Sequence, residues 1–115
     1  MKILYLCTDP GIPLYGRKGC STHVRETVLA LQNLGHEVRI ICSNLEGDPT
    51  PDEHYDVVAL NPPRSRKLGF DLRHVLLNRR ARAELNRQIV QWKPDAIYER
   101  YSLYCTAGEY AAIAH

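Results

Sequence analysis

The N-terminal run Lys2-Ile3-Leu4-Tyr5-Leu6-Cys7 is almost wholly apolar and is followed at once by Asp9-Pro10-Gly11. A short apolar run with such an end is typical of a parallel strand that is covered on both faces. We therefore predict a central strand over residues 2–7. Residues 8–20 contain three glycines and two prolines and are predicted to form a loop.

The rest of the chain alternates between the same two kinds of element. Apolar residues at helical spacing (Val24, Val28, Leu31 and Leu34) predict a helix that Ser21 or Thr22 caps and that Gly35 ends. A second stripe (Leu77, Ala81, Leu85, Ile89 and Trp92) predicts a helix over residues 71–93, which Pro94 closes. Strands are predicted over residues 36–42, 55–60 and 95–99, and a last helix over residues 106–115.

Strands and helices in this order require right-handed crossovers and a parallel sheet. The predicted class is therefore α/β, with a Rossmann-like parallel sheet and flanking helices. The last predicted helix reaches His115 with no turn or cap after it. We expect residues 1–115 to be an incomplete N-terminal domain.

Composition limits the classes of protein that the chain fits. It has 115 residues, of which 44% are hydrophobic and 24% charged, and this excludes a disordered or collagen-like chain. The longest apolar run, Ile3 to Cys7, is far shorter than the roughly 20 residues that span a bilayer. It is also too short for the apolar region of a signal peptide. The four cysteines form no CxxC pair, which favours free thiols in a reducing compartment, so we expect a cytoplasmic protein.

The turn Gly16-Arg17-Lys18-Gly19 is the first candidate binding element, because ligands bind outside the carboxyl ends of parallel strands. Its glycines are too widely spaced for the dinucleotide motif GxGxxG. The turn leads into a helix N-terminus, where unpaired N–H groups favour an anion, although a plain surface turn is the alternative. His23 is expected in the first turn of that helix, where a neutral imidazole could bind a hydroxyl-rich ligand or could only pack.

Several of these motifs together resemble the N-terminal domain of family-four retaining glycosyltransferases with the GT-B fold. The resemblance covers the whole chain and rests on Lys2-Ile-Leu-Tyr, the glycine turn, Gly19-Cys-Ser-Thr-His23-Val, Leu34-Gly-His-Glu-Val38 and Pro94-Asp-Ala-Ile-Tyr-Glu-Arg-Tyr101. The last of these motifs, which contains Tyr98-Glu99-Arg100-Tyr101, resembles the motif of one subgroup of this family. The resemblance implies two Rossmann-like domains facing each other across a cleft, with the acceptor mainly on the N-terminal one.

The resemblance also implies roles for individual residues. Gly16 and Gly19 match the loop that approaches the donor diphosphate and sugar, although here Arg17 and Lys18 separate the two glycines. His23 matches a histidine on the acceptor side, and Glu99 and Arg100 follow a strand at which the family places a polar residue facing the cleft. No metal or cofactor is implied, and the nucleotide-sugar is a substrate. The family's Glu-x7-Glu element has no counterpart here.

The charge of the chain is concentrated in one segment. Residues 64–87 hold eight basic residues against Asp71 and Glu84, a net charge of +6 in a chain whose total is +2. A basic amphipathic helix suits an anionic membrane surface or a lipid-linked acceptor, and the alternative is a solvated outer face. Nucleic-acid binding is disfavoured because no aromatic platform or recognition motif accompanies the charge. The pair His36-Glu37 begins a strand at the wrong end of the sheet for a ligand and is interpreted as structural.

These observations lead to one main hypothesis and two alternatives. The main hypothesis is the acceptor-side half of a nucleotide-sugar-dependent retaining glycosyltransferase that transfers a hexose to a glycan or lipid-linked acceptor. The chain alone should be inactive, because the charges that stabilise the leaving diphosphate would lie in the other domain. The alternatives are a non-catalytic Rossmann-like ligand-binding or regulatory module and half of a nicotinamide-dependent dehydrogenase.

Overall fold

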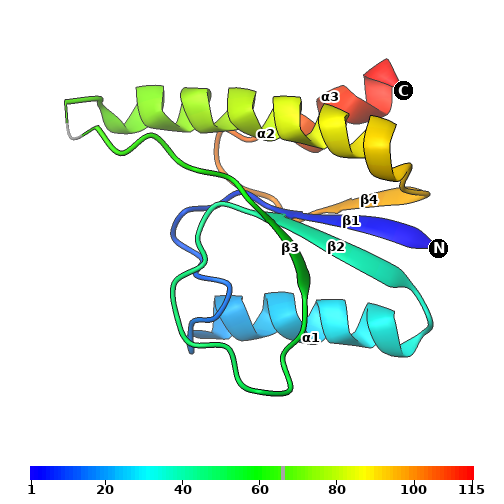
Figure 1. Ribbon diagram of the computed structural model, residues 1–115. Helices are drawn as coiled ribbons and strands as arrows, with labels where there is room; N and C mark the ends of the chain where they lie inside the picture. The colour runs from blue at the N-terminus through cyan, green and yellow to red at the C-terminus, as the bar shows by residue number, and fades with distance from the viewer. Residues whose placement is uncertain (66) are drawn as a thin grey trace.

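A computed structural model describes residues 1–65 and 67–115 of the chain. Strands and helices follow one another as β1 (Lys2–Cys7), α1 (Gly19–Asn33), β2 (Glu37–Cys42), β3 (Asp56–Ala59), α2 (Phe70–Trp92), β4 (Ala96–Glu99) and α3 (Ala107–Ala114) (Figure 1). The predicted elements are all present: β1 has its predicted bounds, and the bounds of the other elements differ by a few residues at most. Arg66, part of the predicted basic segment, lies outside the described residues.

The four strands form one sheet in the order β3-β2-β1-β4, and every pair is parallel. The first strand lies between two neighbours: Tyr5 is in register with Ile40 of β2 and with Tyr98 of β4. This central position explains why β1 is apolar along its whole length. The predicted Rossmann-like fold class is confirmed, and the carboxyl ends of all four strands lie along one edge of the sheet.

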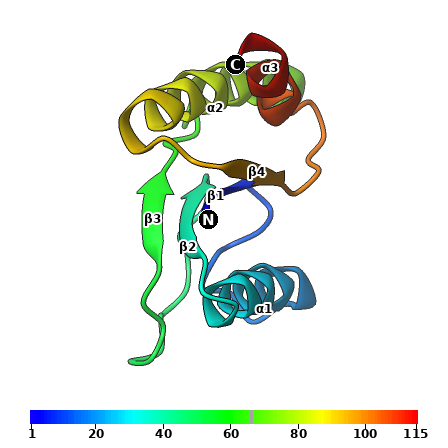
Figure 2. The same ribbon diagram turned by 90° about the vertical axis from the view of Figure 1, so that its right-hand side faces the viewer.

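Helices cover both faces of this sheet, as Figure 2 shows. Side chains of β1 alternate between the faces: Ile3, Tyr5 and Cys7 pack in the cluster that contains α1, whereas Leu4 and Leu6 pack with α2 and α3. All five are buried. Burial of so much apolar surface on two faces is the main source of the domain's stability.

The end of α1 shows why the chain turns back into β2. Gly35 has φ +85°, and its N–H donates to the carbonyl of Gln32 at 2.9 Å. The N–H of His36 donates to the carbonyl of Leu31 at 3.1 Å. This pair of bonds is a Schellman motif, which needs a left-handed residue, so the predicted role of Gly35 is confirmed.

Helix α2 lies across the second face with its predicted apolar stripe turned inward. Leu77, Ala81, Leu85 and Trp92 are buried, and Ile89 is half-buried. Lys93 ends the helix with φ 52°, directly before Pro94. Among the described residues, no helix combines the length and the apolar character needed to cross a bilayer.

Candidate functional site

The glycine turn lies at the carboxyl edge of the sheet, between the end of β1 and the start of α1. Helix α1 begins at Gly19 with Lys18 as its N-cap, and no side chain caps it. The prediction that Ser21 or Thr22 caps the helix is therefore wrong. The helix starts earlier because the N–H of Thr22 already donates to the carbonyl of Lys18 at 3.0 Å.

This earlier start moves His23 from the expected first turn into the second turn of α1. Its side chain is exposed, and its carbonyl accepts the hydroxyl of Thr27 at 2.7 Å. Arg17, Lys18 and Gly19 are also exposed, and Gly16 is half-buried. His23 and the turn therefore present their polar groups to solvent on the α1 side of the sheet.

The two glycines of the turn have different surroundings. A Cβ atom at Gly16 would lie 2.6 Å from Cγ of Pro13 and 2.9 Å from the hydroxyl oxygen of Ser21. A Cβ atom at Gly19 would have no neighbour within 4 Å. Packing within the domain thus explains Gly16, whereas Gly19 leaves open space beside the helix N-terminus.

Arg25 holds the glycine turn in place, a role that sequence reasoning missed. One guanidinium nitrogen donates to the carbonyls of Leu14 at 2.8 Å and Gly16 at 2.6 Å. The Nε atom pairs with the carboxylate of Glu53 at 3.0 Å. One side chain of α1 thereby ties together the loop after β1 and the loop before β3.

Glu99 and Arg100 are neighbours in sequence, but the structure directs them to opposite faces of the sheet. The carboxylate of Glu99 accepts the N–H of Gly108 at 3.3 Å and lies 3.4 Å from Sγ of Cys105. It therefore faces α3. The backbone N–H of Arg100 donates to the carbonyl of Leu6 at 2.9 Å, and its guanidinium lies near Tyr5 and Cys7, on the α1 side.

The charge of Arg100 acts on two buried groups of β1. Burial, together with smaller contributions from Cys7 and Tyr98, raises the pKa of Tyr5 to about 12, and Arg100 offsets part of this rise. Burial likewise raises the pKa of the Cys7 thiol to about 11, again offset in part by Arg100. Both groups are neutral at physiological pH, so neither supplies a negative charge that would pair with the guanidinium of Arg100.

A cavity of about 700 Å³ opens at the carboxyl edge on the other face of the sheet. The loops that follow β1, β3 and β4 line it together with the first turns of α2: Asp9, Pro10, Gly11, Pro62, Pro63, Arg64, Phe70, Arg73, His74, Leu77, Ser102 and Leu103. A second cavity of about 540 Å³ adjoins it and shares Pro10, Pro62 and Arg64. We call the larger of the two cavities the carboxyl-edge cavity. It occupies the place where open parallel sheets bind ligands.

His74 is fixed at the wall of this cavity. Its Nδ1 lies 2.9 Å from the carbonyl of Phe70, so Nδ1 carries the proton that it donates there. The Phe70 ring lies against the imidazole with 4.1 Å between centroids, and the Tyr104 ring meets it edge-on at 5.9 Å. Because Nδ1 is engaged, Nε2 is the atom of His74 that remains to accept a bond from a ligand.

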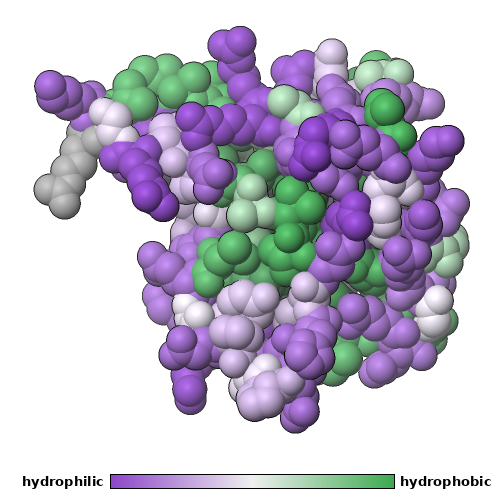
Figure 3. All heavy atoms as spheres, in the orientation of Figure 1, coloured by the Kyte–Doolittle hydropathy of each residue, from purple (hydrophilic) through white to green (hydrophobic). Residues whose placement is uncertain are grey.

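The described basic residues of segment 64–87 fall into two groups, those whose side chains bind other groups of the domain and those whose side chains do not. Arg87 pairs with Glu84 at 2.6 Å, Arg82 stacks on the ring of Tyr110, and Arg80 donates to the carbonyl of Asn61. The remaining described basic residues of the segment are Arg64, Lys67, Arg73 and Arg79, all exposed and all before the middle of α2. In Figure 3, apolar side chains also reach the surface over this N-terminal end of α2.

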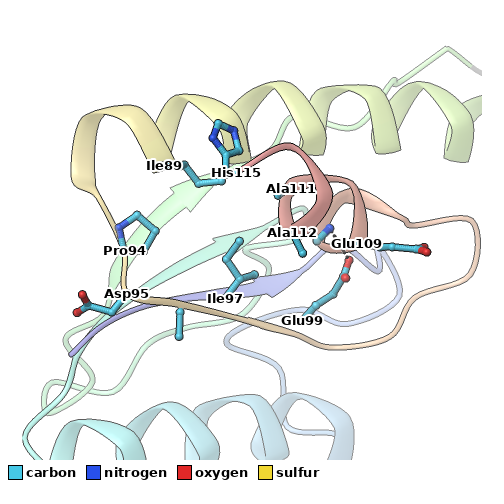
Figure 4. A pocket seen from close by; sticks show the side chains of 11 residues that line it. Ile89, Pro94, Asp95, Ile97, Glu99, Glu109, Ala111, Ala112 and His115 are labelled. Atoms are coloured by element: carbon cyan, nitrogen blue, oxygen red, sulfur yellow. Dashed lines mark hydrogen bonds between the residues drawn. The ribbon is translucent and has the colours of Figure 1, made fainter.

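A groove of about 570 Å³ separates the outer edge of β4 from α2 and α3 (Figure 4). Its lining is mostly apolar, and Figure 4 shows Glu99 pointing from β4 toward α3 at one end of it. This groove lies along a strand edge rather than at the carboxyl ends of the strands. It places Glu99 apart from the carboxyl-edge cavity.

The profile of Glycosyltransferase Family 4 matches residues 17–115. The chain belongs to this family. Comparison with curated proteins gave no match, and comparison with solved structures gave none either. The family resemblance inferred from the motifs is thus confirmed at the level of a family 4 glycosyltransferase domain.

The match to the glycosyltransferase profile includes most of the predicted site. His23, Glu99, Arg100 and three residues of the turn lie inside the matched span, and Gly16 lies just before it. Within residues 1–65 and 67–115, no group of three or more His, Cys, Asp and Glu side chains is arranged to hold a metal ion. The roles of the site residues remain predictions.

The family 4 domain also has a cavity that sequence reasoning did not find. From the sequence, Arg64 and Arg73 are interpreted only as part of a charged segment and Asp9 only as part of the end of a strand, and no role is assigned to Ser102. The available signal was the position of Asn61-Pro62-Pro63-Arg64 directly after a strand. Strand ends that meet at one edge bring their following residues together, as they do here for 9–11, 62–64 and 102–103.

Proposed function

We propose that the chain is the acceptor-side domain of a nucleotide-sugar-dependent retaining glycosyltransferase that transfers a hexose to a glycan or lipid-linked acceptor. The observation that carries this proposal is the family match over residues 17–115 in a domain with a ligand-sized cavity at the carboxyl edge of its sheet. The sequence Tyr98-Glu99-Arg100-Tyr101 supports placement in the subgroup that carries this block.

In this proposal the α1 side of the domain faces the cleft in which donor and acceptor meet. The turn 16–19 approaches the donor diphosphate and sugar, with the open space at Gly19 as the point of closest approach. His23 and Arg100 bind the reacting sugars from the same side. For Glu99 we propose a positioning role, because its carboxylate accepts the N–H of Gly108 at the start of α3.

The proposal also assigns part of the chemistry to residues outside this chain. Stabilising the leaving diphosphate requires donors and cations aimed at its developing charge. The 115 residues contain no Glu-x7-Glu pair of the donor domain that the resemblance implies. We therefore propose that the domain alone transfers no sugar and that it works with a separate nucleotide-sugar domain, in the cytoplasm and at the inner face of the membrane.

The experiment is an exchange of His23 for alanine in a protein that also carries the donor domain. Transfer should fall by roughly ten- to a thousandfold, since each 1.4 kcal/mol of lost transition-state stabilisation is a factor of ten. The melting temperature should hardly change, because the side chain is exposed. Turnover is measured as nucleotide released from UDP- and GDP-sugars.

Glu26→Ala is the matched control, because Glu26 is an exposed residue one turn further along α1. It should leave transfer unchanged. If His23→Ala retains full activity, or if its loss follows a fall in melting temperature, the assignment of His23 fails. If the two-domain protein transfers no sugar at all, the non-catalytic alternative is correct.

A further inference from the structure

The charge inside the carboxyl-edge cavity differs from that expected for a neutral sugar site. Two guanidinium groups, those of Arg64 and Arg73, line it together with one carboxylate, that of Asp9. One oxygen of Asp9 is already engaged, since it accepts the N–H of Gly11 at 2.8 Å. The cavity therefore has an excess of cationic donors over free anionic acceptors.

Within residues 1–65 and 67–115, both guanidinium groups have their donors free. Neither Arg64 nor Arg73 forms a side-chain hydrogen bond or an ion pair with another residue of the described chain. Three other arginines of the segment, Arg80, Arg82 and Arg87, are engaged in contacts within the domain. Free guanidinium groups in a cavity suit bidentate binding of phosphate oxygens.

The start of α2 adds to the same positive potential, which Asp71 in its first turn opposes from outside the cavity lining. Gly69 is its N-cap and has no side chain that could satisfy the first N–H groups of the helix. Phe70 and Arg73, in the first turn, are at the same time cavity residues. The dipole of α2, a helix of 23 residues, is thus directed at the wall that Arg73 forms.

The remaining lining suits the organic part of a phosphorylated ligand. Phe70 and Leu103 provide apolar surface, and Ser102 provides a hydroxyl group. The volume of about 700 Å³ exceeds what a phosphate alone needs and lies in the range of small-molecule sites. A phosphate bound to a sugar or to a glycerol group would fill it.

We propose that the carboxyl-edge cavity binds the phosphate group of a phosphorylated acceptor, which Arg64 and Arg73 hold. This inference rests on the proposed function and narrows its acceptor to a phosphate ester. It places the phosphate group of the acceptor in the cavity on the α2 side, across the edge of the sheet from the glycine turn.

Direct binding to the 115-residue chain tests the proposal without any turnover. Calorimetric titrations use glucose 6-phosphate, glucose, and dihexanoyl phosphatidic acid below its micelle concentration. The two phosphate esters should bind and glucose should not. Arg64→Gln and Arg73→Gln should each weaken phosphate binding by roughly tenfold or more, because each removes charge-assisted hydrogen bonds.

Arg79→Gln is the matched control, since Arg79 is exposed on the same helix and does not line the cavity. Phosphate esters that bind no better than glucose, or equal losses in Arg79→Gln and Arg73→Gln, would overturn the proposal. If binding depends on Arg73, the tighter of the two ligands shows where the phosphate comes from. Tighter binding of the phosphatidic acid identifies the headgroup of a lipid, and tighter binding of glucose 6-phosphate identifies a soluble phosphate ester. Transfer to neutral acceptors by the two-domain protein, without phosphate binding here, would leave the proposed function standing and remove only this inference.

Discussion

Gly16 and Gly19 are three residues apart, yet a methyl group added at each would meet very different surroundings. At Gly16 it would collide with Pro13 and Ser21, whereas at Gly19 it would meet nothing within 4 Å. The family resemblance gives both glycines the same role toward the donor. The structure separates a glycine that packing within the domain requires from one that leaves space for a ligand.

The two glycines therefore predict opposite effects on stability. Gly16→Ala should lower the free energy of unfolding by about 1–3 kcal/mol, because the contacts at 2.6 and 2.9 Å force Pro13 or Ser21 to move. Gly19→Ala should leave it unchanged or raise it by up to about 1 kcal/mol, because alanine is the better helix former. Urea unfolding of both variants measures the difference. Equal losses in the two variants would contradict this account of the turn.

At the scale of elements, the position of α1 relative to the sheet depends on Arg25 as well as on apolar packing. Its guanidinium binds two carbonyls of the glycine loop and the carboxylate of Glu53, and only 16% of the side chain is exposed. The apolar periodicity of α1 could be predicted from the sequence. The bonds of Arg25 could not be predicted, because they join α1 to one loop that precedes it in the sequence and to another that follows it.

Loss of the Arg25 contacts should cost more than loss of the ion pair alone. Arg25→Gln should reduce the free energy of unfolding by roughly 2–4 kcal/mol, since two carbonyls lose a charged donor. Glu53→Gln removes the ion pair with Nε of Arg25 but leaves the two carbonyl bonds of Arg25, and it should cost about 1 kcal/mol or less. The amide oxygen of the glutamine can still accept the N–H of Thr50, and its amide nitrogen then faces Nε of Arg25, with which it forms no bond. Urea titrations in which Glu53→Gln is the more damaging change would show that the ion pair, not the carbonyl contacts, holds the loop.

At the scale of the whole molecule, the sequence predicted the fold better than the site. Periodicity and breakers identify each strand and helix, because burial on one or two faces leaves its pattern in consecutive residues. The start of α1 was predicted wrongly because a backbone bond, from Thr22 to Lys18, replaces the expected side-chain cap. The carboxyl-edge cavity went unpredicted because residues from positions 9, 64, 73 and 102 meet only once the sheet has formed.

Because several arginines of segment 64–87 are engaged within the domain, the structure narrows the part of this segment that could contact a membrane. Arg80, Arg82 and Arg87 are engaged within the domain, so the free charges of Lys67 and Arg79 lie toward the N-terminal end of α2. Apolar side chains are exposed beside them: Phe70 by 55%, Leu72 by 48% and Val75 by 49%. Basic and apolar groups on one surface are the combination that binds an anionic bilayer from one side.

We therefore predict binding to vesicles of phosphatidylserine and phosphatidylcholine, but not to phosphatidylcholine alone, with co-sedimentation as the measurement. Each basic residue near an anionic surface contributes about 1 kcal/mol, so reversing Lys67 and Arg79 to Glu should weaken partitioning about 30-fold or more. Phe70→Ser should weaken it further by removing inserted apolar area, and raising the salt concentration should screen only the charge-dependent part. Arg17→Glu combined with Lys18→Glu is the matched control, because it reverses the same charge before α1, on the opposite face of the sheet. If this control loses as much binding as the Lys67 and Arg79 variant, the attraction follows the net charge of the protein, and α2 is not the membrane-facing surface.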